Sequence, residues 1–171
     1  MKKAIWLGTV LVMLGTASTA LADTVFMTVK AAKQGDIKGS GTQKGKEGAM
    51  QCTSFSSELL VPRDTATGKA SGRLQIDPIK CVKRIDRASP QLVNALLTNE
   101  ALTDVTFSFS HPGKAGEAVA YTLKLKNATV AGVRQFLDPA GLAQEEITIS
   151  YQQATITFVD GGVTVTAEIQ R

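Results

Sequence analysis

The chain has 171 residues, of which 43% are hydrophobic, 20% charged and 5% aromatic, and its formal net charge is +4. These values are typical of one globular domain and argue against wholesale disorder. A single histidine and two cysteines leave little material for a multi-histidine metal site or a zinc ribbon. The composition therefore argues against most common metalloenzyme classes, and we expect neither a cofactor nor a metal.

The first 22 residues have the three-part layout of a secretory signal peptide. A lysine pair gives a positive start, Ile5–Leu14 is an apolar run, and Ala20-Leu21-Ala22 is a small-residue exit. The run is shorter than the roughly 20 residues that a retained membrane-spanning helix needs. We predict cleavage after Ala22, a single mature domain over residues 23–171, and a periplasmic or secreted location without membrane attachment. The alternative is a buried N-terminal helix.

Removing this leader changes the charge balance. The chain has 19 basic and 15 acidic residues, and because the leader contains two lysines and no acid, the mature domain keeps 17 basic and 15 acidic residues. The resulting net charge of +2 gives little support to nucleic-acid binding by charge. We expect no nucleic acid among the partners.

A glycine-rich segment follows the first expected strand, Thr24–Val29. Residues 35–48 contain five glycines and three lysines, a composition that suggests a phosphate-binding loop. The spacing contradicts this, because a P-loop requires a second glycine five residues after the first, and in this chain lysines occupy those positions after Gly39 and Gly41. We therefore interpret the segment as a flexible surface loop.

Cys52 and Cys81 lie in two segments with an apolar pattern. Residues 62–72, which favour turns, join these segments. If these segments form a hairpin centred near Ala66 and Thr67, the two cysteines face each other. A disulfide can persist outside the cytosol. A bridge that closes about 30 residues would stabilise the fold by roughly 3 to 4 kcal/mol. The alternative is two free buried thiols.

One segment has helical periodicity. Ser89-Pro90 supplies a capping hydroxyl followed by proline at the first helical position. The apolar residues that follow fall on one face: Leu92, Val93, Leu96 and Leu97. The pattern predicts one short α-helix over about residues 89–98.

In the remaining chain, apolar and polar residues alternate with the two-residue period of β-strands. Residues 105–110 and 119–125 predict a hairpin whose turn spans 111–116. The apolar parity slips at Gln152-Gln153, which predicts a bulge, and Asp160-Gly161-Gly162 predicts a tight turn into a last strand. A mainly β fold follows, an antiparallel barrel or sandwich that buries one face of each strand and limits free edges.

No residue pattern for catalysis emerges. His111, the only imidazole, precedes Pro112 in the expected turn, where exposure to solvent is usual, and a triad would need partners supplied by tertiary folding. Most acidic residues border glycine, proline or a charged neighbour, so we interpret these as solvent-exposed loop positions: Asp36, Glu47, Asp64, Asp104, Glu117, Asp138, Glu145, Glu146 and Asp160. We expect the protein not to be an enzyme.

The stretch from Met50 to Leu97 resembles the haemolysin-coregulated protein family, the tube subunit of the bacterial type VI secretion system. The shared features are a strand that ends in Val61-Pro62, a long polar loop closed by Ser71-Gly72-Arg73, a second strand over residues 79–86 and the helix start at Ser89-Pro90. With weaker matches on either side, the resemblance covers most of residues 25–159.

This resemblance implies a small antiparallel β-barrel with one short helix and a long projecting hairpin loop. It also implies that about six copies close into a ring and that rings stack into a tube. The implied partners are further copies of the chain and a secreted effector cargo or a spike protein. In the family the long loop reaches the neighbouring ring, so we predict ring-to-ring contacts at Val61, Pro62, Arg63, Asp64 and Lys69. The alternative is a mobile tip without contacts.

Two other functions stay open on the sequence alone. A periplasmic binding module could keep this fold without building a tube. A secreted hydrolase would need a paired nucleophile and base, which the residue pattern does not supply. A non-enzymatic structural subunit is our leading interpretation.

Overall fold

The computed structural model describes residues 22–113 and 116–168. The predicted leader, residues 1–22, lies outside these ranges except for its last residue. Within the described part of the chain, no helix has the length and the apolar character of a membrane span.

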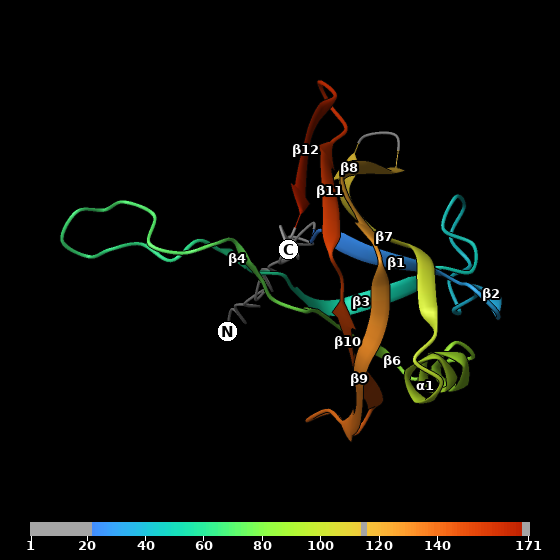
Figure 1. Ribbon diagram of the computed structural model, residues 1–171. Coiled ribbons are helices and arrows are strands. Elements are labelled where there is room, and N and C mark those ends of the chain that lie inside the picture. Colours follow the sequence, from blue (N-terminus) through green and yellow to red (C-terminus); the bar gives the residue numbers. More distant parts are fainter. Residues whose placement is uncertain (1–21, 114–115, 169–171) are drawn as a thin grey trace, which may run out of the picture.

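Six antiparallel strands close into a barrel in the order β7, β9, β10, β6, β3, β1 and back to β7 (Figure 1). The bounds of these strands are β1 Thr24–Ala31, β3 Met50–Ser56, β6 Ile79–Arg84, β7 Ala101–Gly113, β9 Ala128–Leu137 and β10 Ala143–Ser150. The predicted small antiparallel barrel is confirmed.

Strand β7 belongs to the barrel and also begins a second sheet. Its first residues pair with β9, whereas from Val105 onward it pairs with β8 (Gly116–Lys126). Strand β8 then pairs with β11 (Gln153–Phe158), which pairs with β12 (Val163–Glu168). We call β8, β11 and β12 the wing, whose β11 and β12 reach the top of Figure 1.

Three short strands complete the fold. Strand β2 (Gly35–Ile37) pairs with the end of β1, and β4 (Leu59–Leu60) pairs with β5 (Gln75–Ile76) in a separate two-stranded ribbon. That ribbon starts the long loop that extends away from the barrel in Figure 1.

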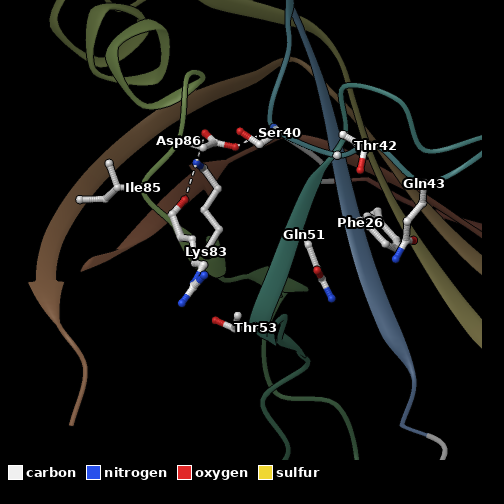
Figure 2. Close-up of a pocket in the computed structure, with 12 residues that line it drawn as sticks. Phe26, Ser40, Thr42, Gln43, Gln51, Thr53, Lys83, Ile85 and Asp86 are labelled. Atoms are coloured by element: carbon white, nitrogen blue, oxygen red, sulfur yellow. Dashed lines mark hydrogen bonds and ion pairs between the residues drawn. The ribbon is translucent and has the colours of Figure 1, made fainter. Parts of the chain in front are cut away.

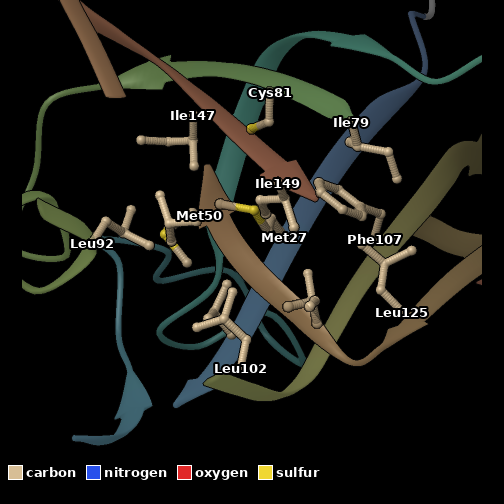
Figure 3. Close-up of a cluster of buried hydrophobic side chains, with 14 of the residues drawn as sticks. Met27, Met50, Ile79, Cys81, Leu92, Leu102, Phe107, Leu125, Ile147 and Ile149 are labelled. Carbon is tan, nitrogen blue, oxygen red and sulfur yellow. The ribbon is translucent and has the colours of Figure 1, made fainter. Parts of the chain in front are cut away.

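The barrel interior follows the alternation seen in the sequence, because successive side chains of a strand point to opposite faces. Met27, Phe107, Ile147 and Ile149 have no exposed surface. Figure 3 shows these side chains gathered between the strands. Full burial of a large apolar side chain is worth about 1.5–3 kcal/mol relative to exposure. Much of the stability of the fold therefore arises inside the barrel.

Helix α1 spans Ser89–Leu97 and packs against β9 (Figure 1). Proline lies in the first turn as predicted, but Ser89 does not cap the helix: the N-cap residue is Ala88, and no side chain caps it. The Ser89 hydroxyl accepts the Asp86 amide proton at 2.9 Å and donates to Glu145 Oε1 at 2.6 Å. The predicted apolar face is also wrong at its end, because Leu97 is 79% exposed. It lies five residues after the buried Leu92, about 140° around the helix axis.

Two predicted turns differ from the structure. Strand β7 continues to Gly113, so His111 and Pro112 lie in a strand and not in the turn. At Gln152 the chain does not bulge within one strand; β10 ends at Ser150, and β11 begins at Gln153 with different partners. The predicted tight turn at residues 160–162 is confirmed by the β11–β12 pairing.

The hairpin predicted around the cysteines is formed by β3 and β6. A bulge at Thr53 shifts the register, so Cys52 pairs with Lys83 and is a diagonal neighbour of Cys81. The cysteine Cα atoms are nevertheless 5.6 Å apart, and a disulfide joins the side chains. This Cα separation is ordinary for such a bridge.

The glycine-rich segment lies at the surface, as predicted, with residues 42–45 exposed, and hydrogen bonds join its two ends. The Gly39 amide donates to the Gly48 carbonyl at 2.7 Å, and the Gly41 amide donates to the Ala49 carbonyl at 2.9 Å. A Cβ atom on Gly39 would lie 2.4 Å from Cγ of Met50. Close backbone packing against the core therefore accounts for this glycine.

Candidate self-association surfaces

The loop between β3 and β6, residues 57–78, forms an arm that extends far from the barrel (Figure 1). Its stem is the β4–β5 ribbon, and a bridge between Arg63 and Ala70 closes the tip. From Arg63 to Arg73 every residue is exposed, while Val61 and Pro62 are half-buried. The arm thus places most of its surface in solvent.

Hydrogen bonds within the arm fix the shape of its tip. Oδ1 of Asp64 accepts protons from the Ala66 amide at 3.1 Å, the Thr67 amide at 2.7 Å and the Thr67 hydroxyl at 2.8 Å. These bonds, chiefly the one from the Thr67 hydroxyl, hold the pKa of the Asp64 carboxyl below its ordinary value. Gly68 has a φ of +69°, which suits glycine, and its amide donates to the Asp64 carbonyl at 2.8 Å. The tip is therefore a defined turn.

The five residues predicted to contact a neighbouring ring all lie in this arm. Val61 and Pro62 follow the stem directly, and Pro62 packs so closely on Gly72 that a Cβ there would be 3.1 Å from Pro62 Cγ. Arg63, Asp64 and Lys69 lie at the exposed tip, where the Arg63 guanidinium donates to the Gly68 carbonyl at 3.2 Å. The arm therefore combines an apolar stem with a charged tip.

A second surface is the apolar face of the wing. Across the sheet, Phe107 on β7 is in register with Leu123 on β8, which is in register with Ile156 on β11 and then Val165 on β12. Exposure rises along this row from 0% at Phe107 to 59% at Val165. The next row ends in Phe158 and Val163, which are 46% and 62% exposed. The face leads from the core out into solvent.

The inner part of this face is an aromatic groove. Phe55 makes edge-on contacts with Phe107 and Phe109, and Phe109 makes one with Tyr121, each with ring centroids 5.0 Å apart. Such edge-on pairs contribute about 0.5–1.5 kcal/mol each. The groove has a volume of about 600 Å³, and Leu59 from the arm lies in its wall. Contiguous exposed apolar surface of this kind marks interaction sites on soluble proteins.

A buried ionic cluster lies where β6, β10 and α1 meet. Nζ of Lys83 is 2.8 Å from Oε1 of Glu145 and 2.7 Å from Oδ1 of Asp86, and the Lys83 and Glu145 side chains are 1% and 0% exposed. The Ser89 hydroxyl and the Gln135 amide donate to the two oxygens of Glu145 at 2.6 and 3.2 Å. The interpretation of Glu145 as a solvent-exposed loop residue is therefore wrong.

Register explains why this carboxylate is buried. Glu145 shares its inward parity with Ile147 and Ile149, and Lys83 shares its parity with Ile79 and Cys81. The pairing of β6 with β10 sets the two charges directly opposite each other. The period-2 pattern in the two segments was the signal that could have found the pair.

Figure 2 shows Lys83 and Asp86 facing each other at the wall of a pocket of about 330 Å³. Ser40, Gln51 and Phe26 also line this pocket. Because two carboxylates already engage the Lys83 ammonium, its charge is compensated. The cluster serves to fasten the start of α1 to the barrel.

His111 pairs with Asp23, a contact that no local sequence pattern predicts. The pairing of β1 with β7 places Thr24 opposite Ser110 and so brings Nδ1 of His111 to Oδ1 of Asp23. Both side chains are more than half exposed. Among the described residues, no group of three or more histidines, cysteines and acids is arranged to hold a metal ion.

A family model described as "Type VI secretion system effector, Hcp" matches residues 26–158. The chain belongs to the Hcp family. The matched range contains the barrel except for the first two residues of β1, together with α1, the arm and two strands of the wing, whereas β12 lies beyond it.

Known relatives have the same fold. This Hcp chain is 27% identical over 159 residues to the "Major exported protein" of Pseudomonas aeruginosa strain PAO1. The aligned region covers 83% of this chain and 92% of that protein. The solved Hcp1 protein of E. coli EAEC 042 superposes with a TM-score of 0.79 at 28% identity over 86% of this chain and 99% of that chain. The secreted protein Hcp3 of Pseudomonas aeruginosa has a TM-score of 0.73 at 24% identity over 88% of this chain and all of that chain, which shows the shared fold.

These matches confirm the resemblance carried by residues 50–97. As an Hcp protein, the chain is a secreted structural subunit of the type VI secretion tube. Self-association is consistent with that role. The arm and the apolar face of the wing are the two described surfaces suited to it.

Proposed function

We propose that the mature chain, residues 23–171, closes about six copies into a ring and that stacked rings meet through the arm. The main support for this proposal is the structure of the arm. Its tip is held by its own hydrogen bonds, and its charged residues Arg63, Asp64 and Lys69 are all exposed.

The physical reason lies in the cost of ordering a contact segment. Binding by a mobile loop must pay for each backbone and side-chain position that becomes fixed. Three hydrogen bonds to Asp64 and the bridge between Arg63 and Ala70 already fix the tip in the isolated chain. Such a tip loses little conformational entropy when it meets a neighbouring ring.

Export belongs to the same proposal. The leader would direct the chain out of the cytosol, be cleaved after Ala22 and leave Asp23 as the first residue of the mature protein. The bridge between Cys52 and Cys81 would form in that oxidising compartment. A secreted effector or a spike protein is the further partner that the family resemblance implies for the assembled ring.

Native mass spectrometry of residues 23–171 at increasing concentration tests the ring. We expect a stable species of about six copies. A strict monomer at high concentration would contradict the proposal. N-terminal sequencing of the exported protein checks cleavage, and a first residue other than Asp23 would refute the predicted site.

Two substitutions at one residue separate the shape of the tip from its charge. Asp64→Asn keeps the oxygen that accepts from Ala66 and Thr67 but removes the charge, whereas Asp64→Ala removes both. If the shape of the turn matters most, Asp64→Ala weakens ring stacking and Asp64→Asn preserves it. Equal loss in both variants would assign the contact to the charge.

A further inference from the structure

The arm carries basic side chains on a backbone that is paired on one side only. Arg63, Lys69 and Arg73 are all exposed. In a two-stranded ribbon each strand is an edge strand, so one row of its backbone amides and carbonyls faces outward. An extended peptide bound in a protein cleft pairs its backbone as an added strand, and the pocket of a protease selects the side chain that precedes the cut. The arm therefore presents the features that a protease specific for basic residues recognises.

One stretch of the arm is longer on its second strand than on its first. Between the β4–β5 pairing and the bridge at the tip, residues 61–62 lie opposite residues 71–74. The second strand has four residues there against two on the first, so its peptide groups cannot all take part in regular pairing. Arg73 lies in this longer stretch, which makes the bond between Arg73 and Leu74 the most accessible one.

The arm can open without loosening the barrel. Its tip is closed by a few backbone hydrogen bonds, such as that from the Asp64 amide to the Lys69 carbonyl at 2.9 Å, between residues that are exposed. Exposed backbone bonds far from a core break at low free energy, and exposed loop tips are preferred sites of proteolytic cleavage. Figure 1 shows that the arm extends clear of the barrel.

The disulfide spans the arm. Cys52 on β3 precedes the three basic residues, and Cys81 on β6 follows them. A cut at any of these residues therefore leaves two pieces that the bridge still joins. Each piece is also held by strand pairing, because β3 pairs with β1 and β6 pairs with β10.

The glycine-rich segment is a second exposed stretch that contains lysines. Its two ends are held together, since the Gly39 amide donates to the Gly48 carbonyl at 2.7 Å, and Gly39 packs against Met50. A loop fastened to the core in this way is harder to extend into the cleft of a protease than the arm is. The arm is the more accessible of the two.

We infer that the arm is a processing site for a protease that cleaves after arginine or lysine, and that the product is a disulfide-linked two-chain protein with an intact barrel. Water adds across the peptide bond after the basic residue, which leaves a carboxylate on the first piece and an ammonium group on the second. One consequence rests on the proposed function of the arm: the cut chain forms rings that no longer stack.

Limited digestion of the mature chain, residues 23–171, with trypsin tests the site. We expect one band on a gel without reductant and two bands after reduction, with masses that place the cut after Arg63, Lys69 or Arg73. The cut protein should keep the circular dichroism of the uncut protein. In sedimentation it should form single rings without stacks.

Two variants separate the arm from exposed basic residues elsewhere. Arg63→Gln, Lys69→Gln and Arg73→Gln together should slow cleavage at least about tenfold, because the pocket of the protease requires the basic side chain. Lys124 supplies the control, since it is exposed but its strand β8 pairs with β7 on one side and β11 on the other. Lys124→Gln should leave both the rate and the position of the cut unchanged.

Three results would overturn the inference. A first cut outside the arm, as in the glycine-rich segment, would remove the site. Pieces that separate without reductant would show that the bridge does not hold the product together. Cut rings that stack like uncut rings would show that processing does not control assembly. If the uncut chain forms no rings, the proposed function fails, whereas the position of the cut and the linkage are read from the chain itself and still decide this inference.

Discussion

The barrel and the arm of this chain are ordered by opposite means. The barrel depends on side chains far apart in sequence, such as Lys83 with Glu145 and Cys52 with Cys81, which meet in the interior. The arm is ordered by neighbours within a few residues of one another, as at Asp64 and Thr67. Substitutions in the barrel should therefore change the free energy of unfolding, whereas substitutions in the arm should change contacts between copies.

Two carboxylates illustrate the difference. Glu145 has no exposed surface and depends on the charge of Lys83, while Asp64 is exposed and bonds to its own turn. The same functional group thus supports the fold in one region and shapes a surface in the other.

The largest effect is expected at the buried ion pair. Lys83→Met leaves the Glu145 carboxylate buried without its cation and should lower the free energy of unfolding by about 3–5 kcal/mol. Denaturant unfolding with the disulfide intact measures it. The double variant Lys83→Met with Glu145→Leu should recover most of the loss. If the double variant is as unstable as the sum of the two single variants, the pair does not act as a unit.

The disulfide should have the next largest effect. Replacing Cys52 and Cys81 together by alanine removes the cross-link over a sequence separation of 29 residues. The loss should be roughly 3 to 4 kcal/mol in the chain-entropy model. Thermal unfolding of the two forms checks this. A thiol assay on denatured, unreduced exported protein should find no reactive sulfur, and two titratable thiols would refute the bridge.

A smaller, pH-dependent effect is expected at Glu100, which follows α1. Its carboxylate accepts the amide protons of Lys33 and Gln34 at 2.5 and 2.9 Å. The bond from Gln34 contributes most to holding the pKa of Glu100 below its ordinary value of 4.5. The stabilisation is therefore complete above that value and is lost as the pH falls through the lowered pKa.

Unfolding curves of Glu100→Gln measure this contribution. The variant should be less stable than the unaltered protein at neutral pH, and the difference should shrink as the solution is acidified. A difference that stays constant down to the acid range would show that the charge of Glu100 does not contribute.

The sequence was sufficient for features that depend on local pattern. The alternation of residues 105–110 predicted a strand, Ser89-Pro90 predicted the start of α1, and residues 62–72 predicted a turn-rich connection between two strands. Each of these signals is a periodicity or a turn preference of adjacent residues.

Features that depend on register could not be read in the same way. The alternation places Glu145 on the inward face of its strand, but its cation, Lys83, is identified only when the two strands are paired. Likewise, the groove forms only once β11 pairs with β8, which places Phe158 beside Tyr121. Contacts between copies are a further step, because one chain does not contain the geometry of its assembly.

The division between barrel and arm is tested most directly by shortening the arm. Replacing residues 64–69 by Asn-Gly provides a two-residue hairpin turn between Arg63 and Ala70, which already form a bridge. Sedimentation analysis and denaturant unfolding of this variant and the unaltered mature chain form one paired measurement. We predict a change in unfolding free energy within about 0.5 kcal/mol, intact single rings and no stacked rings. Stacking at the unaltered level would contradict the role of the arm.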